Sequence, residues 1–462
     1  MVNSTVITFF SLFLILGGLA NASDAASYKN SELFAKAEKM LGNVDAHLDT
    51  ELDTLVSDLE SLQGDEQYIA QSFLAYASLR KKYSMSDKDI FQYTKIAAEK
   101  GHALSQNNLG YCFEYEIGCE RSEKEAVEWY RKAAEQGFAV GQSNLGKCLQ
   151  IGIGCERDEK EAVEYYRKAA IQGNASAQNR LGTCLVRGTG CAKNEVEAVE
   201  WVRKSADQGY AVGQYNLGCG LNSGIGCDKD EEEAVKWYRK AAEQGYTLAQ
   251  NDLGYYLQNG IGCEKDEEEA VKWYRKSAEQ GDAEGQCNLG YYLQYGIGCA
   301  KDEEEAVKWY RKAAEQGDAV GQYNLGYCHE RGIGCEKDEK EAVKWYRKAA
   351  EKGDAPSQRC LGSCLHSGVG CAKDEEEAIM WTRKAAEQGD ATAKCNLGMC
   401  YEEGYGCEKN EQEAIKWYRE AAEQGEPTAQ RNLGYCYLWG IGGQKNLVKA
   451  FWWLFKSTMP RE

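Results

Sequence analysis

The chain is poor in proline, histidine and basic residues. Its 462 residues include three prolines and four histidines, and the net charge is −18. So few prolines leave little room for proline-rich linkers. The negative charge argues against nucleic-acid binding, which needs a basic face to displace counterions, and it disfavours an anionic membrane surface. We therefore expect no nucleic-acid partner.

Metal-ligand spacing is also missing. The sequence contains no Cys-x-x-Cys, and its histidines are scattered. Structural zinc sites bring such ligands close together in the chain. The sequence therefore predicts no metal site, and it gives no sign of a cofactor.

Long apolar runs are scarce, with one exception at the start of the chain. Val6–Leu19 is almost entirely apolar, and Ala20-Asn21-Ala22 follows as a small-x-small cleavage site. This layout predicts a signal peptide over residues 1–22, although it carries no Lys or Arg. An uncleaved anchor is the alternative, but the run is shorter than the roughly 20 residues that span a bilayer. We expect a secretory-pathway protein (secreted, in the ER lumen or periplasmic) without a transmembrane anchor after cleavage.

A 36-residue repeat fills most of the chain. Copies open at every 36th residue from Gln106 to Gln430, as in Gln286–Gly321. A fixed period in this range is typical of a solenoid of stacked helical units. Residues 106–462 form the predicted array, residues 70–105 a diverged capping repeat, and residues 23–69 an N-terminal helical segment.

Each unit predicts two helices. The first is short and ends at a Gly-x-Gly motif. The second begins at an Asp, Asn or Ser followed three residues later by Glu, such as Asp302 and Glu305, which is the pattern of a capping box. The unit is therefore all-α.

The repeated motif resembles the Sel-one-like repeat (SLR) family, relatives of the tetratricopeptide repeat. The residues that carry the resemblance are Leu289-Gly290, Gly296-x-Gly298, Asp302, Ala306, Trp309-Tyr310, Lys312-Ala313-Ala314 and Gly317. The resemblance implies an all-α, right-handed α-α superhelical solenoid of about ten to eleven 36-residue helix-pair repeats. It also implies a concave face that binds proteins or peptides. The chain departs from the family by carrying Cys, where an aliphatic residue is usual, after Gly-x-Gly.

The 20 cysteines fall mainly in two columns, one in the first helix and one after Gly-x-Gly. Six units carry both. A loop that folds back over its helix could bring such a pair within disulfide range, and an exported chain favours the bond. Cysteine-rich bacterial members of the resembled family are stapled in this way, with a different spacing. The candidate disulfide residues are Cys112 and Cys119, Cys148 and Cys155, Cys184 and Cys191, Cys328 and Cys335, Cys364 and Cys371, and Cys400 and Cys407.

Buried thiols that act as small apolar residues are the alternative to these disulfides. Some cysteines lack the regular partner, so their connectivity stays open. They are Cys219, Cys227, Cys263, Cys287, Cys299, Cys360, Cys395 and Cys436.

Catalysis is not expected, because it needs one distinct constellation and the units are nearly identical. Some cysteine-rich relatives in the resembled family are described as β-lactamases. The sequence contains one Ser-x-x-Lys, Ser78–Lys81, without Ser-Asp-Asn or Lys-Thr-Gly companions. A cell-wall or β-lactam hydrolase therefore stays an alternative, as does a purely structural secreted protein.

The first helix offers candidate binding residues. Counted from the residue that opens each unit, such as Gln286, its second, third, sixth, ninth and tenth positions are predicted to face away from the buried side and to line the concave face. Tyrosines and amides there suit peptide recognition. The candidates are Tyr255, Tyr291, Tyr327, Asn288 and Asn324, unless they recur only because the unit was copied.

Two further candidates lie outside this pattern. The last helix places Trp452 and Phe455 where other units carry charge, which suggests a surface for a partner, a membrane interface or self-association, or else local packing under the tail. Asn174 begins a glycosylation triplet. The sequence as a whole predicts a non-catalytic interaction scaffold or adaptor.

Overall fold

The computed structural model describes residues 85–459. The predicted signal peptide (1–22), the N-terminal segment (23–69) and Ser78–Lys81 lie outside the described residues, as does the first part of the predicted capping repeat (70–105). Within the described residues the regular elements are 21 helices. The all-α fold class is confirmed.

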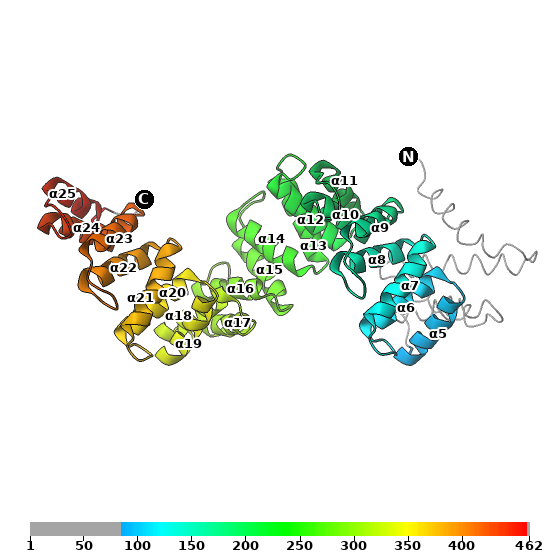
Figure 1. Cartoon of the computed structure of the whole chain (residues 1–462), viewed down its shortest axis with the longest axis horizontal. Coiled ribbons are helices and arrows are strands. Elements are labelled where there is room, and N and C mark those ends of the chain that lie inside the picture. The colour runs from blue at the N-terminus through cyan, green and yellow to red at the C-terminus, as the bar shows by residue number, and fades with distance from the viewer. Residues whose placement is uncertain (1–84, 460–462) are drawn as a thin grey trace, which may run out of the picture. The chain divides into compact units, whose positions relative to one another are not determined.

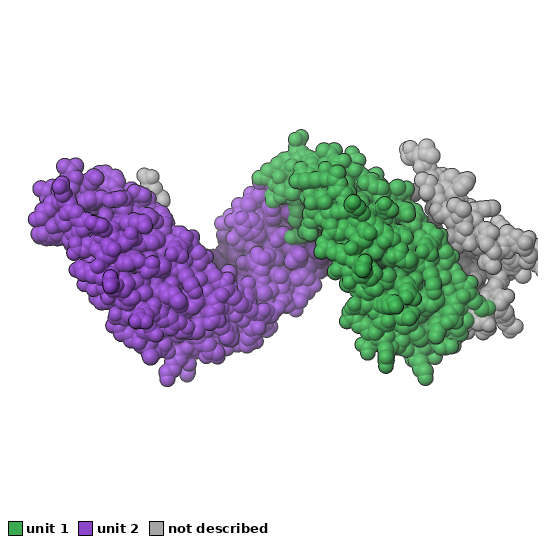
Figure 2. Space-filling view, in the orientation of Figure 1, with its two compact units in different colours: residues 1–230 green, residues 231–462 purple. Residues whose placement is uncertain are grey.

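The chain divides into two compact units, residues 1–230 and 231–462, which Figure 2 shows in green and purple. The described helices of the first unit are α5 (Asp87–Glu99), α6 (Ala103–Tyr115), α7 (Glu123–Glu135), α8 (Ala139–Ile151), α9 (Glu159–Ile171), α10 (Ala175–Arg187), α11 (Glu195–Asp207) and α12 (Ala211–Ser223).

The second unit continues the same alternation, and Figure 1 shows successive helices packed in pairs within each unit. Its helices are α13 (Glu231–Glu243), α14 (Thr247–Asn259), α15 (Glu267–Glu279), α16 (Ala283–Tyr295), α17 (Glu303–Glu315), α18 (Ala319–Arg331), α19 (Glu339–Glu351), α20 (Ala355–Ser367), α21 (Glu375–Glu387), α22 (Ala391–Glu403), α23 (Glu411–Glu423), α24 (Pro427–Trp439) and α25 (Leu447–Lys456).

From α6 on, each even-numbered helix is the first helix of a repeat, and the odd-numbered helix after it is the second. In the repeat built from α16 and α17, the first helix ends at Gly296, whose φ of 66° lies in the left-handed region. Within each unit, each described helix packs on its neighbours in the chain, and several first helices also contact the first helix of the next repeat, such as α6 with α8 and α16 with α18. This nearest-neighbour packing is that of a solenoid.

The start of the second helix corrects part of the capping-box prediction. Asp302 Oδ1 accepts from the backbone N–H of Glu305 at 2.8 Å, as predicted. The Asp302 N–H, however, donates to the Leu293 carbonyl of the first helix at 2.9 Å and not to Glu305. The second bond of the capping box, from the Asp302 N–H to the Glu305 side chain, is therefore absent, because the adjoining first helix supplies the acceptor for this N–H.

The Glu305 carboxylate is instead a link between repeats. Its Oε1 accepts from Arg275 Nη1 at 2.6 Å and from Trp309 Nε1 at 3.1 Å. The hydrogen bond from Arg275, with the indole adding to it, holds the pKa of Glu305 below its ordinary value. The same arrangement of Arg and Glu, 30 residues apart, joins Arg131 to Glu161, Arg167 to Glu197, Arg239 to Glu269, and Arg347 to Glu377.

Two glycines allow this close stacking. Gly290 lies against the ring of Tyr310, and a Cβ there would stand 2.7 Å from Tyr310 Cε1. Gly298 has a φ of +64°, and its Cβ would stand 2.3 Å from the Glu267 carbonyl oxygen of the preceding repeat. The Leu-Gly and Gly-x-Gly motifs are therefore contact points between helices, and the Gly-x-Gly motif also ends the first helix.

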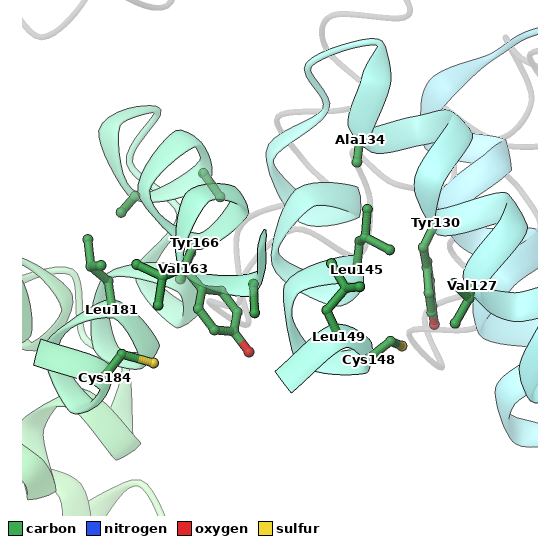
Figure 3. Close-up of a cluster of buried hydrophobic side chains, with 14 of the residues drawn as sticks. Val127, Tyr130, Ala134, Leu145, Cys148, Leu149, Val163, Tyr166, Leu181 and Cys184 are labelled. Atoms are coloured by element: carbon green, nitrogen blue, oxygen red, sulfur yellow. The ribbon is translucent and has the colours of Figure 1, made fainter. Parts of the chain in front are cut away.

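The core is one repeated packing pattern. Figure 3 shows it in the first unit, where Tyr130 of α7 lies with Leu145 and Cys148 of α8, followed by Tyr166 and Leu181 one repeat later. Tyr130, Leu145 and Tyr166 are fully buried. Both helices of a repeat therefore bury an apolar face. Within residues 85–459, no helix is long and apolar enough to cross a membrane.

Candidate functional site

The predicted binding tyrosines lie on successive first helices of the second unit. Tyr255 of α14 and Tyr291 of α16 are 50% and 47% exposed. Tyr327 of α18 is half-buried. The structure therefore places all three on the first-helix side of the repeats, at the same position of each helix.

Two tyrosines that sequence reasoning did not single out extend this group. Tyr295, at the tenth position of its repeat, is 55% exposed, and its ring centroid lies 4.7 Å from that of Tyr291. Tyr323, at the second position, stacks on Tyr327 with centroids 6.4 Å apart. Both positions were predicted to face away from the core, but neither forms a column of tyrosines, so repetition gave no signal. We call Tyr255, Tyr291, Tyr295, Tyr323 and Tyr327 the tyrosine face.

The asparagine candidates have a different environment. Asn288 Nδ2 donates to Asn251 Oδ1, on the preceding first helix, at 2.9 Å. The same bond joins Asn144 to Asn107 and Asn216 to Asn179. Asn324 is half-buried. The amide of Asn288 is thus engaged in stacking one repeat on the next.

The ninth position of the first helix is also occupied by an internal bond. Gln294 Oε1 accepts from the hydroxyl of Tyr310 in the second helix at 3.0 Å. Burial raises the pKa of Tyr310 well above its ordinary value, so the hydroxyl stays a donor. Gln258 and Glu330 accept from Tyr274 and Tyr346 in the same way. Of the five predicted positions, the sixth and tenth are the ones that carry exposed tyrosines here.

The cysteine candidates are all thiols in the structure. Cys119 Sγ lies 3.6 Å from the Cys112 carbonyl oxygen, so the loop does fold back over its own helix. Cys407 lies 3.5 Å from the Cys400 carbonyl in the same way. Burial raises the pKa of the first-helix thiols, to about 12 for Cys112. The disulfides stay a prediction.

The last helix, α25, exposes the two predicted aromatic residues. Trp452 is 53% exposed and Phe455 63%, whereas the adjacent Trp453 is buried. Val448 and Phe451 of the same helix are exposed as well. These side chains form an apolar surface on one face of α25.

The glycosylation candidate Asn174 is the N-cap of α10. Its Oδ1 accepts from the Ala177 N–H at 2.8 Å. A glycan attaches through the other amide atom, so this cap and a glycan are compatible. Modification of Asn174 stays a prediction.

Residues 85–459 contain no cluster of three or more His, Cys, Asp or Glu side chains that could hold a metal ion. Two open surface recesses, of about 750 and 550 Å³, lie at equivalent places in different repeats, beside Asp158 and Cys191 in one and beside Asp338 and Cys371 in the other. Because they recur at equivalent positions, these recesses are a feature of the repeat shape and do not mark a distinct site.

Comparison with known proteins agrees with this architecture. No match was found among curated proteins. The chain is similar to the crystal structure of c5321, a protective antigen of uropathogenic Escherichia coli strains displaying an SLR fold, with 34% identity over 90% of this chain and 87% of that one and a TM-score of 0.72. It is 36% identical to a Sel1 repeat protein from Oxalobacter formigenes over 53% of this chain and 96% of that one, with a TM-score of 0.49.

The family model for the Sel1 repeat matches ten consecutive segments without a gap. They are residues 103–138, 139–174, 175–210, 211–246, 247–282, 283–318, 319–354, 355–390, 391–426 and 427–459. These segments cover well over half of the chain and coincide with the helix pairs described above. The chain therefore belongs to the Sel1 repeat family.

Proposed function

We propose that this protein is a non-catalytic scaffold that binds an extended polypeptide segment on the tyrosine face. The Sel1 repeat fold is in general a protein-interaction module, and Sel1 solenoids are in general non-catalytic. The proposal adds the location of the site and the chemistry of the partner.

The observation that carries it is the difference between polar and aromatic positions on the first helices. The amide of Asn288 and the Gln294 carbonyl oxygen are bonded within the array, whereas Tyr255, Tyr291 and Tyr295 expose about half of their side chains. Tyrosine supplies a large contact area at low cost in side-chain entropy and has a hydroxyl for backbone groups of a partner.

The chemistry of this face favours a partner that is not strongly charged. The Arg331 guanidinium lies 5.8 Å from the Tyr327 ring centroid, and Arg359 and Asp354, of opposite charge, both act on Tyr323. Aromatic surfaces of this kind accept apolar and proline side chains of an extended segment, with hydroxyl groups binding its backbone. We therefore expect a peptide of apolar and aromatic residues to bind.

Selection from a random-peptide library on the immobilised full chain tests the proposal. The affinity of a selected peptide is compared between the wild-type chain and a variant with Tyr255→Ala, Tyr291→Ala and Tyr327→Ala. We expect a loss of about tenfold or more, since aromatic anchors carry much of the energy of such interfaces. Circular dichroism should be unchanged.

A control for this test replaces exposed lysines of the second helices, Lys272→Ala and Lys308→Ala, and should bind the peptide as the wild type does. Equal binding by the tyrosine variant would refute the tyrosine face. A chain that selects no peptide would favour the purely structural alternative. Nitrocefin turnover that disappears in Ser78→Ala would instead support the hydrolase.

We also propose that the scaffold works in an exported compartment with its paired cysteines joined. The apolar run Val6–Leu19 and the near approach of Cys119 to the Cys112 carbonyl support this. N-terminal sequencing of the secreted chain should begin at Ser23. Full alkylation of the isolated chain without reductant would exclude the disulfides.

The exposed side chains of α25 support self-association as a second property of the scaffold. Sedimentation velocity should show a concentration-dependent species above the monomer that Trp452→Glu with Phe455→Glu removes. A monomer at all concentrations would exclude it.

A further inference from the structure

One repeat carries a histidine at the position that stands over its cysteine loop. The eighth position of the first helix is leucine in most repeats, including Leu257, Leu293 and Leu365, but it is His329 in α18. The His329 side chain is nine-tenths buried. It lies between Arg311 of α17 and Cys335 of the loop that follows α18.

His329 also changes the partner of Arg311. In the repeats on either side, Arg275 and Arg347 bind the glutamate 30 residues later. Arg311 Nη2 instead lies 3.2 Å from His329 Nε2, and the corresponding glutamate, Glu341, binds Lys344 at 3.0 Å. The carboxylate that accompanies the arginine in neighbouring repeats therefore has another cation here.

The contact with Arg311 determines where the proton of the imidazole lies. A guanidinium group can only donate, so His329 Nε2 must accept. The ring proton is then on Nδ1, which lies 3.6 Å from Cys335 Sγ. His329 is in position to donate this proton to the sulfur.

The equivalent cysteines have the opposite arrangement. Cys263 and Cys299 donate to backbone carbonyls at 3.6 Å, and Cys407 donates to one at 3.5 Å. A carbonyl acceptor stabilises the protonated thiol, whereas an N–H donor stabilises the thiolate. Among the described cysteines that follow Gly-x-Gly, Cys335 is the one whose sulfur contacts a histidine nitrogen.

The charges around these sulfurs point in the same direction. Burial raises the pKa of both Cys299 and Cys335, and the nearby arginine opposes this increase in each case. Glu305 raises the pKa of Cys299 further, whereas burial and Arg311 are the main influences on the pKa of Cys335, as burial and Arg383 are on that of Cys407. Cys335 is partly exposed, as are the other cysteines that follow Gly-x-Gly, so a reagent can reach it.

We propose that Cys335 is the reactive thiol of the reduced chain, a modification site for low-molecular-weight disulfides at which His329 and Arg311 are positioning residues. The Cys335 thiol first loses its proton to solvent. The thiolate then attacks one sulfur of RS–SR, so that the Cys335–S–SR bond forms and the S–S bond of the reagent breaks. The leaving RS⁻ takes a proton from solvent, and the reagent is reduced as Cys335 is oxidised. In a second exchange, the Cys328 thiol would lose its proton to solvent and attack the Cys335 sulfur, which forms the predicted Cys328–Cys335 disulfide, breaks the Cys335–S–SR bond and releases the second RS⁻ to be protonated by solvent.

The test uses the reduced full chain and one equivalent of 4,4′-dithiodipyridine at pH 7, with peptide mass spectrometry after acid quenching and alkylation of the remaining thiols. We expect Cys335 to be modified about tenfold faster than Cys407, which also lies near an arginine but donates to a carbonyl. Tenfold corresponds to about one pKa unit of thiolate population.

The matched variant is His329→Leu, which installs the residue that other repeats carry at this position and therefore keeps the fold. Cys335 should then react at the rate of Cys263 and Cys299. His329→Asn, which keeps an N–H donor near the sulfur, should restore part of the preference. Preferential modification of another cysteine, or an unchanged preference in His329→Leu, would overturn the proposal.

Discussion

At the residue scale, the second glycine of each Gly-x-Gly motif meets two separate constraints. Gly298 has a positive φ, and a Cβ would lie 2.3 Å from the Glu267 carbonyl oxygen. Gly281 also has a positive φ (+95°), but nothing lies within 4 Å of its Cβ position. A comparison of substitutions at Gly298 and Gly281 therefore distinguishes the effect of close packing from that of backbone strain.

We predict that Gly298→Ala lowers the free energy of unfolding by about 1–3 kcal/mol more than Gly281→Ala, because an additional methyl must displace backbone of the preceding repeat. Urea unfolding followed by circular dichroism measures both. Equal losses would mean that the loop shifts to accept the methyl group.

Buried thiols predict a dependence of stability on alkaline pH. Burial is the first cause that raises the pKa of Cys148, to about 12 from 9.0. A group whose folded pKa is raised stabilises the fold fully below its unfolded pKa, and this contribution disappears as pH rises toward the folded pKa. In reductant, the wild-type chain should therefore lose stability between about pH 9 and 12 more steeply than Cys148→Ala. Parallel slopes in urea unfolding at several pH values would contradict this.

The sequence could predict three of the five residues of the tyrosine face. Tyr255, Tyr291 and Tyr327 recur at one position, so the repeat itself marks them. Tyr295 and Tyr323 stand at positions that vary, and only the structure shows their rings beside those of Tyr291 and Tyr327. The bond from Asn288 to Asn251 depends on how first helices stack, which no local pattern encodes.

At the scale of the element, successive second helices are linked by an ion pair that uses the glutamate of the predicted capping box. Arg275 binds Glu305 at 2.6 Å, with both side chains about one-third exposed. Because this hydrogen bond lowers the pKa of Glu305, its contribution is present above the ordinary carboxylate pKa and is lost as pH falls below it.

We expect Glu305→Gln to destabilise the chain by about 0.5–1 kcal/mol at pH 7, as for partly exposed ion pairs. The difference from wild type should shrink as pH falls below about 4.5, where the unfolded carboxylate is protonated. Glu304→Gln, at an exposed neighbouring position, is the control and should have little effect. A penalty for Glu305→Gln that persists at pH 3 would show that the ion pair is not its origin.

Helix positions were predictable because their signals are local. Asp302 caps its helix through a residue three positions away, so the pattern is complete in the sequence. The Asp302 N–H bonds to Leu293 of another helix, and the Glu305 carboxylate bonds to Arg275 of another repeat. These partners are fixed by packing, which explains why the capping box was half right.

At the scale of the whole molecule, the array is held by contacts between neighbours in sequence. A destabilising substitution in one repeat should therefore lower the local stability of that repeat and its neighbours only. In hydrogen exchange, Gly298→Ala should increase amide exchange in α15, α16 and α17, while α24 and α25 keep wild-type rates. A uniform increase along the second unit would show that this unit unfolds as one cooperative block.

The repeat determines the fold, whereas the proposed binding and thiol chemistry depend on residues that differ between repeats. Those residues, the tyrosine face and His329 beside Cys335, lie in neighbouring repeats of the second unit. The proposed function requires that a polypeptide binds to the tyrosine face of the first helices.

Site-specific photo-cross-linking tests this claim most directly. A benzophenone amino acid replaces Tyr291 on the first-helix face in one variant and exposed Lys308 on the second helix in the other, and each is irradiated with the selected peptide. The account predicts a cross-linked product from position 291 that excess unlabelled peptide prevents, and none from position 308. Cross-linking from position 308 with none from position 291 would contradict it.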